Sequence, residues 1–171
     1  MNLRIYISIM VILCAFSHNC FAAQNLKAVA VSGGEQSSLV VAENGEVFFA
    51  GAIGYSNSTV FDRVLAGEMG TSTGLLENIT AVGAGWFHAL ALTKTGQVVA
   101  WGDNSAGELG NGKDGYTPGY DAYENFPIWI HAGAQNSNQD ANLSNITCIA
   151  AGRSGTHSLF VDSSHNCYAT G

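Results

Sequence analysis

One glycine-rich stretch decides the fold of this chain: Trp101-Gly102-Asp103-Asn104-Ser105-Ala106-Gly107-Glu108-Leu109-Gly110-Asn111-Gly112. It completes an apolar run that begins a few residues earlier. Glycine accepts backbone conformations that other residues avoid, so Gly102, Gly107 and Gly110 allow the chain to leave a strand through a compact turn. Leu109 is then expected to return to an apolar layer. The stretch therefore predicts an ordered corner at the end of a strand.

The sequence around this corner is repeated along the chain. Residues 31–51 align without a gap on residues 82–102, at an offset of 51 residues. A third copy covers residues 146–171, with two extra residues near Arg153 and a longer preceding loop. Self-similarity at a fixed period of this length indicates a repeat architecture, in which each repeat is one supersecondary unit.

Each copy contains a β-hairpin signature. Apolar residues at 90–92 and 98–101 flank Thr95-Gly96, just as those at 39–41 and 47–49 flank Asn44-Gly45. A tight two-residue turn needs a positive φ, which glycine adopts without steric cost. No sustained helical period follows residue 23, so we predict an all-β protein with three or four short strands in each unit of roughly 50 residues. Such small sheets bury their apolar faces by stacking, and radial stacking gives a β-propeller.

The middle copy also carries a family resemblance. The glycine-rich stretch, together with Val82-x-Ala84-Gly85-x-x-His88-x-Leu90-x-Leu92 and Gly96, resembles the regulator-of-chromosome-condensation repeat, the unit of a seven-bladed β-propeller. The resemblance implies that His88 forms a hydrogen bond within its blade and that His157 has the same role. It implies structural roles for these positions: Gly85, His88, Gly96, Trp101, Gly102, Asn104, Gly107, Leu109 and Gly110.

The other two copies depart from the pattern. The first has Ser37 where the middle copy has His88, and it lacks the corner stretch. The third has Ser164-His165-Asn166 where the turn glycine is expected, and it stops at Gly171. We therefore expect an incomplete propeller of about three blades, with the last unit cut.

The first residues are typical of a secretory signal peptide. Arg4 supplies the positive charge, residues 5–16 form an apolar core, and Ala22 and Ala23 offer small residues for cleavage. The apolar core is too short to span a membrane, which takes about 20 residues. We predict a signal peptide over residues 1–22, a secreted or periplasmic location, and a mature chain without a membrane span.

The remaining residues are then divided among the repeats. We predict a partial β-propeller over residues 23–171, with units at about 26–77, 78–145 and 146–171. Cys148 and Cys167 remain in the mature chain and could pair in an oxidising compartment. Because the repeats place them on non-adjacent strands, two unpaired apolar side chains are the favoured interpretation.

Composition excludes one class of partner. The chain has 13 acidic and 6 basic side chains, a formal net charge of −7, so it lacks the basic footprint that phosphate backbones require. It also has 21 glycines and only 2 prolines, as expected for an ordered protein with many tight turns. We predict that it does not bind nucleic acid.

Two phosphate-site patterns overlap in the corner. Gly110-x-Gly112-x-x-Gly115 matches a dinucleotide motif, but Tyr116-Thr117-Pro118-Gly119 follows it and cannot open the helix that the motif needs. The stretch from Gly107 to Lys113 mimics a P-loop, but Asp114 replaces the hydroxyl that binds magnesium. No catalytic triad motif or metal-ligand spacing is present in the sequence, so we predict a protein that is not an enzyme and uses no cofactor or metal.

The longest insertion, residues 111–139, is rich in aromatic residues. Aromatic side chains on a loop bury a large area on binding at low entropic cost, so they are candidate anchors for a partner protein. The alternative is that they cover the neighbouring blade. The predicted partner-binding residues are Tyr116, Tyr120, Tyr123 and Trp129.

These observations favour a non-catalytic β-propeller scaffold that binds another protein. The resemblance allows a narrower role, inhibition of a secreted enzyme. It also includes guanine-nucleotide exchange on a small GTPase, which an export signal disfavours because the GTPase is cytosolic. A fourth alternative is that the blades belong to a larger enzyme whose active site lies outside this sequence.

Overall fold

The computed structural model of the chain describes residues 27–71, 73–136, 138 and 141–171. The predicted signal peptide lies outside the described residues. Among the residues that are described, no helix has the length and apolar character needed to cross a membrane.

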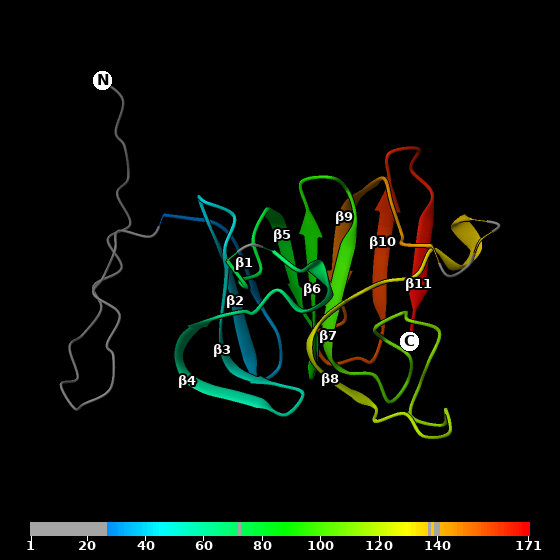
Figure 1. The fold of residues 1–171 in the computed structure, drawn as a ribbon, viewed down its shortest axis with the longest axis horizontal. Coiled ribbons are helices and arrows are strands. Elements are labelled where there is room, and N and C mark those ends of the chain that lie inside the picture. Colours follow the sequence, from blue (N-terminus) through cyan, green and yellow to red (C-terminus); the bar gives the residue numbers. More distant parts are fainter. Residues whose placement is uncertain (1–26, 72, 137, 139–140) are drawn as a thin grey trace.

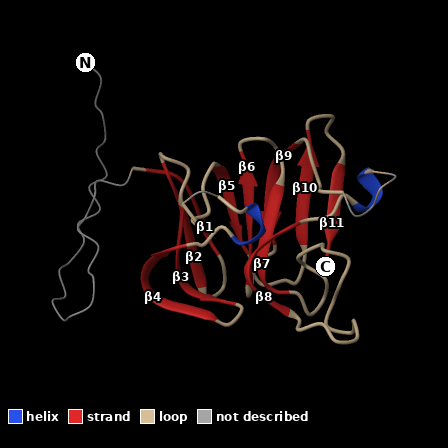
Figure 2. Ribbon diagram, in the orientation of Figure 1, coloured by secondary structure: helices blue, strands red, loops and turns tan. Residues whose placement is uncertain are grey.

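The described chain forms three antiparallel sheets, in which each strand pairs with its neighbour in sequence (Figures 1 and 2). Sheet 1 contains β1 (Ala28–Gly33), β2 (Ser37–Ala42), β3 (Val47–Ile53) and β4 (Ser56–Arg63). Sheet 2 contains β5 (Ile79–Ala84), β6 (His88–Thr93), β7 (Val98–Asp103) and β8 (Tyr123–Trp129). Sheet 3 contains β9 (Ile146–Ala151), β10 (Ser158–Asp162) and β11 (Cys167–Thr170). Two short 3₁₀ helices, η1 (Gly67–Met69) and η2 (Gly133–Gln135), lie in the loops between sheets.

The all-β prediction is therefore confirmed, and the predicted hairpin turns have the required geometry. Gly45 and Gly96 have φ values of 84° and 78° in the β2–β3 and β6–β7 turns. In the third sheet His165 adopts φ 67° at the place where the sequence lacks glycine. The Asp162 carboxylate accepts hydrogen bonds from the backbone N–H groups of Ser164 and Asn166, which holds this turn closed.

Two apolar cores hold the sheets together. Side chains alternate along β6, so Ala89 and Ala91 face sheet 1 while Leu90 and Leu92 face sheet 3. The first core, between sheets 1 and 2, includes Leu39, Val41, Ile53, Val82, Val99 and Trp101. The second core, between sheets 2 and 3, includes Val98, Ala100, Leu109, Ile130, Ile146 and Phe160. Figure 1 shows the three sheets side by side in chain order, the arrangement of successive propeller blades.

Sheets 1 and 2 are in close contact at Gly102. Its φ is 105°, and an added Cβ would overlap the carbonyl oxygen of Phe87 and lie 2.9 Å from Cγ2 of Ile53. The Phe87 carbonyl accepts hydrogen bonds from the N–H groups of Gly54 and Asp103, both at 3.0 Å. The end of β7 is thus fixed to the hairpin that joins β3 and β4, and only glycine fits at the crossing.

We expect Gly102→Ala to lower the free energy of unfolding by roughly 2 kcal/mol or more, because the left-handed backbone and the steric overlap both oppose a side chain. Urea unfolding followed by circular dichroism measures this change. Gly33→Ala is the control, since a Cβ at Gly33 meets no atom within 4 Å. Equal unfolding midpoints for the two variants would show that the crossing tolerates a side chain.

Candidate protein-binding surface

The corner stretch is held by one buried amide. Asn104 is fully buried, and its Oδ1 accepts the backbone N–H of Leu109 at 2.8 Å. Its Nδ2 lies 3.0 Å from Oδ1 of Asn111 and 3.0 Å from the hydroxyl oxygen of Tyr120. Leu109 is also fully buried and packs in the second core. Residues 115–119 form turns, so no helix N-terminus is placed there to hold a phosphate.

Glu108 is a second buried polar side chain in this corner. Its carboxylate accepts the backbone N–H of Ala106 at 2.9 Å, and burial raises its pKa above the ordinary range. The backbone carbonyl of Glu108 accepts the hydroxyl of Ser158, a residue of sheet 3, at 2.9 Å. The corner of sheet 2 is thus attached to the next sheet.

His88 takes part in the same contact. Its ring packs over Gly85 and is 1% exposed, and its Nε2 lies 3.1 Å from Oγ of Ser158. Because the single hydroxyl proton of Ser158 goes to the Glu108 carbonyl, Nε2 must carry a proton and donate it to Oγ. The family resemblance implied that His88 forms a hydrogen bond within its own blade. In the structure this hydrogen bond joins sheet 2 to sheet 3. Nδ1 of His88 has no hydrogen-bond partner among the described residues.

The loops at one end of the sheets meet in a common surface. Strands alternate in direction, so the hairpins that follow β1, β3, β5, β7 and β9 all emerge at the same end, the lower end in Figure 1. The N–H of Glu35 donates to the carbonyl of Gly85, and the hydroxyl of Ser154 donates to the Glu35 carboxylate at 3.3 Å, so loops from all three sheets adjoin. We call this end the insertion face; its loops are residues 34–36, 54–55, 85–87, 104–122 and 152–157.

Two of the four predicted partner-binding residues are available on the insertion face. Tyr116 is 90% exposed at the tip of the long loop. Tyr123 is half-buried, and its ring centroid lies 4.4 Å from that of Tyr55 in the β3–β4 turn of sheet 1. Nothing in the structure tests whether these residues contact a partner, so that role stays a prediction.

The other two predicted residues support the fold. The hydroxyl of Tyr120 accepts from the side-chain amides of Asn104 and Asn111 and donates to Glu124 at 2.9 Å. Trp129 is half-buried against the first core, as the blade-covering alternative supposed. Its backbone N–H donates to the Glu68 carboxylate at 3.0 Å.

Sequence reasoning missed two surface aromatics. Tyr55 is 64% exposed, and Trp86 is 43% exposed and stacked on Phe87 at 5.4 Å. Each of them follows a glycine in the tip of a hairpin loop, and this position in the sequence could have predicted that they are exposed. Three loops of the insertion face and the adjoining start of β8 thus present four aromatic side chains: Tyr55, Trp86, Tyr116 and Tyr123.

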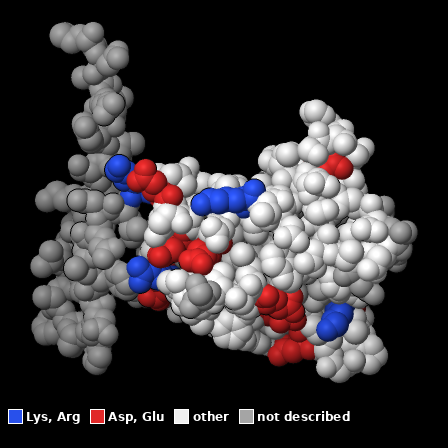
Figure 3. All heavy atoms as spheres, turned by 45° about the horizontal axis from the view of Figure 1, so that its top comes forward, with Lys and Arg blue, Asp and Glu red and all other residues white. Residues whose placement is uncertain are grey.

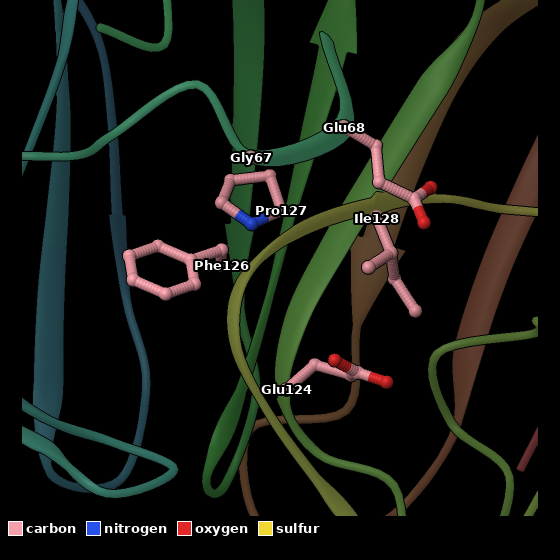
Figure 4. A pocket seen from close by; sticks show the side chains of 6 residues that line it. All are labelled: Gly67, Glu68, Glu124, Phe126, Pro127 and Ile128. Carbon is pink, nitrogen blue, oxygen red and sulfur yellow. The ribbon is translucent and has the colours of Figure 1, made fainter. Parts of the chain in front are cut away.

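A shallow cleft lies outside this face, between η1 and β8. It has a volume of about 420 Å³ and is open to solvent. Figure 4 shows Glu68, Ile128 and Glu124 on one side of the β8 backbone and the Phe126 ring on the other. The backbone of Gly67 packs directly on the carbonyl of Pro127, which leaves no room for a side chain there. Within the described ranges, no group of three or more His, Cys, Asp or Glu side chains could hold a metal ion.

Comparison with known proteins agrees with this architecture. Residues 79–108, from the start of β5 to the corner stretch, match the model of the regulator of chromosome condensation (RCC1) repeat. The chain contains an RCC1 repeat. Human HERC6, a probable E3 ubiquitin-protein ligase, is 37% identical over 95 residues, which cover 54% of this chain and 9% of that protein. Human HERC2, also an E3 ubiquitin-protein ligase, is 35% identical over 100 residues, 54% of this chain and 2% of that protein.

Solved structures show the same fold. Human WBSCR16 superposes with a TM-score of 0.60 at 17% identity, over 87% of this chain and 34% of that chain. The structure of Kap60 bound to yeast RCC1 (Prp20) gives a TM-score of 0.59 at 20% identity, over 87% of this chain and 32% of that chain. The three sheets are therefore blades of an RCC1-type propeller, and the chain spans about a third of the length of these solved chains.

The blade geometry also separates the two cysteines. Val161 in β10 pairs with Cys148 of β9 on one side and with Cys167 of β11 on the other. Neighbouring strands lie about 4.8 Å apart, so the two Cα atoms are roughly 9.5 Å apart, beyond the limit of about 7 Å for a disulfide. Both cysteines are exposed and unpaired.

We expect both thiols of the folded chain to react with a thiol reagent, without prior reduction, because the blade holds them too far apart to pair. Counting modified cysteines by mass spectrometry after cleavage between residues 148 and 167 measures this outcome. A disulfide-linked pair of peptides from a monomeric sample would contradict the register of sheet 3.

The buried His88 predicts a pH dependence of stability. Burial lowers its pKa from 6.5 to about 4, the Asp103 carboxylate opposes this shift, and His157 adds to it. Folding thus favours the neutral ring, and the stability it contributes is complete above pH 6.5 and is lost as the pH falls toward 4. We expect a loss of roughly 2 kcal/mol between pH 7.5 and pH 5 from this group, measured by urea unfolding.

His88→Gln should reduce that pH dependence, because glutamine can still donate to Ser158 but does not titrate. His157→Gln should change the pH dependence much less: His157 packs over Gly152 as His88 packs over Gly85, but it is exposed, and it is the smallest of the causes that shift the pKa of His88. An unchanged slope in His88→Gln would exclude His88 as the titrating group.

Proposed function

We propose that this chain is part of a non-catalytic β-propeller scaffold, secreted or periplasmic, that binds another protein through its insertion face. The observation that carries the proposal is the set of aromatic side chains on three anchored loops and at the start of β8: Tyr55, Trp86, Tyr116 and Tyr123. Large aromatic side chains on a surface are the usual anchors of protein interfaces.

The construction of the long loop supports this function. Asn104, Asn111 and Tyr120 tie its base to the corner of sheet 2, so the exposed Tyr116 is carried by a loop with buried supports. Ordering a loop before binding reduces the entropic cost of association. One of these side-chain hydrogen bonds is buried and the other two are partly buried, so they hold the base of the loop in one conformation.

The comparisons supply a precedent for protein binding. Yeast RCC1 (Prp20) has been solved in complex with Kap60, and Prp20p from Saccharomyces cerevisiae is described with its binding properties to Gsp1p and histones. Kap60, Gsp1p and histones are partners of the yeast protein. For this chain the acidic balance supports a protein partner and disfavours nucleic acid.

The location and the narrower role rest on the first 22 residues. Their charge and apolar pattern supports export, and an exported binding scaffold could inhibit a secreted enzyme. Export also disfavours nucleotide exchange on a cytosolic GTPase. The remaining alternative, the blade portion of a larger enzyme, places the active site outside this sequence.

The full-length chain, immobilised and exposed to culture medium and periplasmic extract of its source organism, tests this function. We expect one protein to be retained in a fixed ratio to the chain, and Trp86→Ala to weaken its binding by about tenfold or more, as for an interface anchor. Phe61→Ala is the control, because Phe61 is 51% exposed on β4, outside the loops that form the insertion face.

Equal weakening by the two variants, or no retained protein, would contradict the proposed function. If the retained protein is an enzyme, an assay of its activity with the chain in excess decides the inhibitor role, for which we expect loss of activity.

A further inference from the structure

Three side chains from two blades converge at the edge of the insertion face. Tyr55 comes from the β3–β4 turn of sheet 1, and Tyr123 begins β8 of sheet 2. Their ring centroids are 4.4 Å apart and their planes are inclined by 33°. Asp103, the last residue of β7, pairs with Tyr123 in the register of β7 and β8. Two rings and a carboxylate are thus gathered at the junction of the two sheets.

In this group Tyr55 is exposed, Asp103 and Tyr123 are half-buried, and all three are held in place. Tyr55 is 64% exposed, yet the turn that carries it is fixed by the hydrogen bond from the N–H of Gly54 to the Phe87 carbonyl. The same carbonyl accepts the N–H of Asp103, so one backbone atom positions both residues. Oδ1 of Asp103 accepts the N–H of Ser105 at 2.9 Å, which orients the carboxylate. A ligand would therefore meet a preformed surface.

The charge near the rings is negative. The Asp103 carboxylate is the main cause of a raised pKa of the Tyr123 phenol, and Asp121 adds to it, so both carboxylates act on the ring. The ion pairs that the structure shows between described residues, Lys27–Glu43 and Arg63–Glu46, lie elsewhere. Figure 3, in which the end opposite the insertion face comes forward, shows acidic and basic side chains singly or in small groups on the side it presents.

Aromatic faces and a carboxylate are complementary to one kind of group. A guanidinium stacks on an aromatic ring through cation–π attraction and donates two parallel hydrogen bonds to a carboxylate. Arginine fits both features better than lysine, whose ammonium is compact and strongly hydrated. A neutral side chain would leave the Asp103 charge without a partner.

We propose that Tyr55, Tyr123 and Asp103 form a receptor for an arginine side chain on an exposed loop of the partner protein. This inference rests on the proposed function, because it names the chemistry by which the insertion face recognises its partner. The guanidinium stacks on the exposed Tyr55 ring and pairs with Asp103, while Tyr123 supports the Tyr55 ring from the second blade.

The probe is the peptide acetyl-Gly-Ser-Arg-Ser-Gly-amide, titrated into the full-length chain with NMR detection of tyrosine rings and backbone amides. We expect the signals of Tyr55, Tyr123 and Asp103 to shift with a dissociation constant near ~1 mM, the weak range for one side-chain contact. The same peptide with citrulline, which has the shape of arginine without its charge, should bind roughly fivefold more weakly or not at all.

Variants separate the two contacts. Asp103→Asn keeps the acceptor for the Ser105 N–H but removes the charge, and Tyr55→Leu removes the stacking surface; each should weaken binding roughly two- to fivefold. Tyr55→Phe should bind like the original chain. Asp62→Asn is the matched charge control, because Asp62 lies near the other end of β4 and accepts the hydroxyl of Ser58.

Several results would overturn the receptor. These are ring signals that do not move up to roughly 10 mM peptide, equal shifts with citrulline, binding unchanged in Asp103→Asn, or a lysine peptide that binds as tightly as the arginine peptide. Failure of the receptor and failure of the scaffold are distinguishable. If a protein is captured and Asp103→Asn does not change its binding, the arginine receptor is contradicted and the scaffold function stands. If the peptide binds but no protein is captured, the scaffold function is contradicted and the receptor stands.

Discussion

A four-stranded antiparallel sheet has two faces, and this protein covers them by stacking one sheet on the next. Sheet 2 shows the consequence most clearly, since all six residues of β6 are buried and its alternate side chains enter two different cores. Small residues at 89, 91 and 100 allow the neighbouring sheets to approach, and larger ones at 90, 92 and 101 fill the space between them. The strands could not keep their register if either core were lost, because each sheet is completed by its neighbour.

The contacts between sheets are polar at their edges and apolar at their centres. Along the edge nearest the insertion face, the Phe87 carbonyl, the Ser158 hydroxyl and the Glu108 carbonyl each link two sheets through short hydrogen bonds. Buried polar groups are costly unless they are paired, so these bonds fix how one blade sits on the next more sharply than apolar packing does. The unpaired Nδ1 of His88 is the exception in this network, and it accompanies the acid sensitivity of the ring.

The candidate binding surface is a product of the same stacking. The hairpin that carries Tyr55 reaches across to Gly102, and the absence of a side chain at Gly102 is what brings Tyr55 beside Tyr123 and Asp103. The surface therefore belongs to neither blade alone. Residues that look equivalent in the linear repeat have different uses: His88 is buried between sheets, its counterpart His157 is exposed, and Ser37 takes that position in sheet 1.

The sequence by itself determined the all-β class, the hairpins and the corner, because each depends on residues close together in the chain. Alternating apolar residues specify a strand, glycine at 45 and 96 specifies a turn, and the repeat at an offset of 51 residues requires that the units be alike. The same local pattern predicted that Leu109 returns to an apolar layer, and Leu109 is buried; Asn104, whose structural role only the family resemblance implied, is buried as well.

Only the tertiary structure decided which of the aromatic residues are available. In the sequence, all four aromatic residues of the insertion are equal candidates for partner binding. In the structure, the hydroxyl of Tyr120 accepts a hydrogen bond from the buried Asn104 amide, and Trp129 packs against the core between sheets 1 and 2. The pairs Tyr55–Tyr123 and His88–Ser158 join residues 68 and 70 positions apart in different blades. A repeat pattern describes what lies inside one blade, whereas these pairs depend on the rotation between blades, which is set by side-chain packing across the two cores.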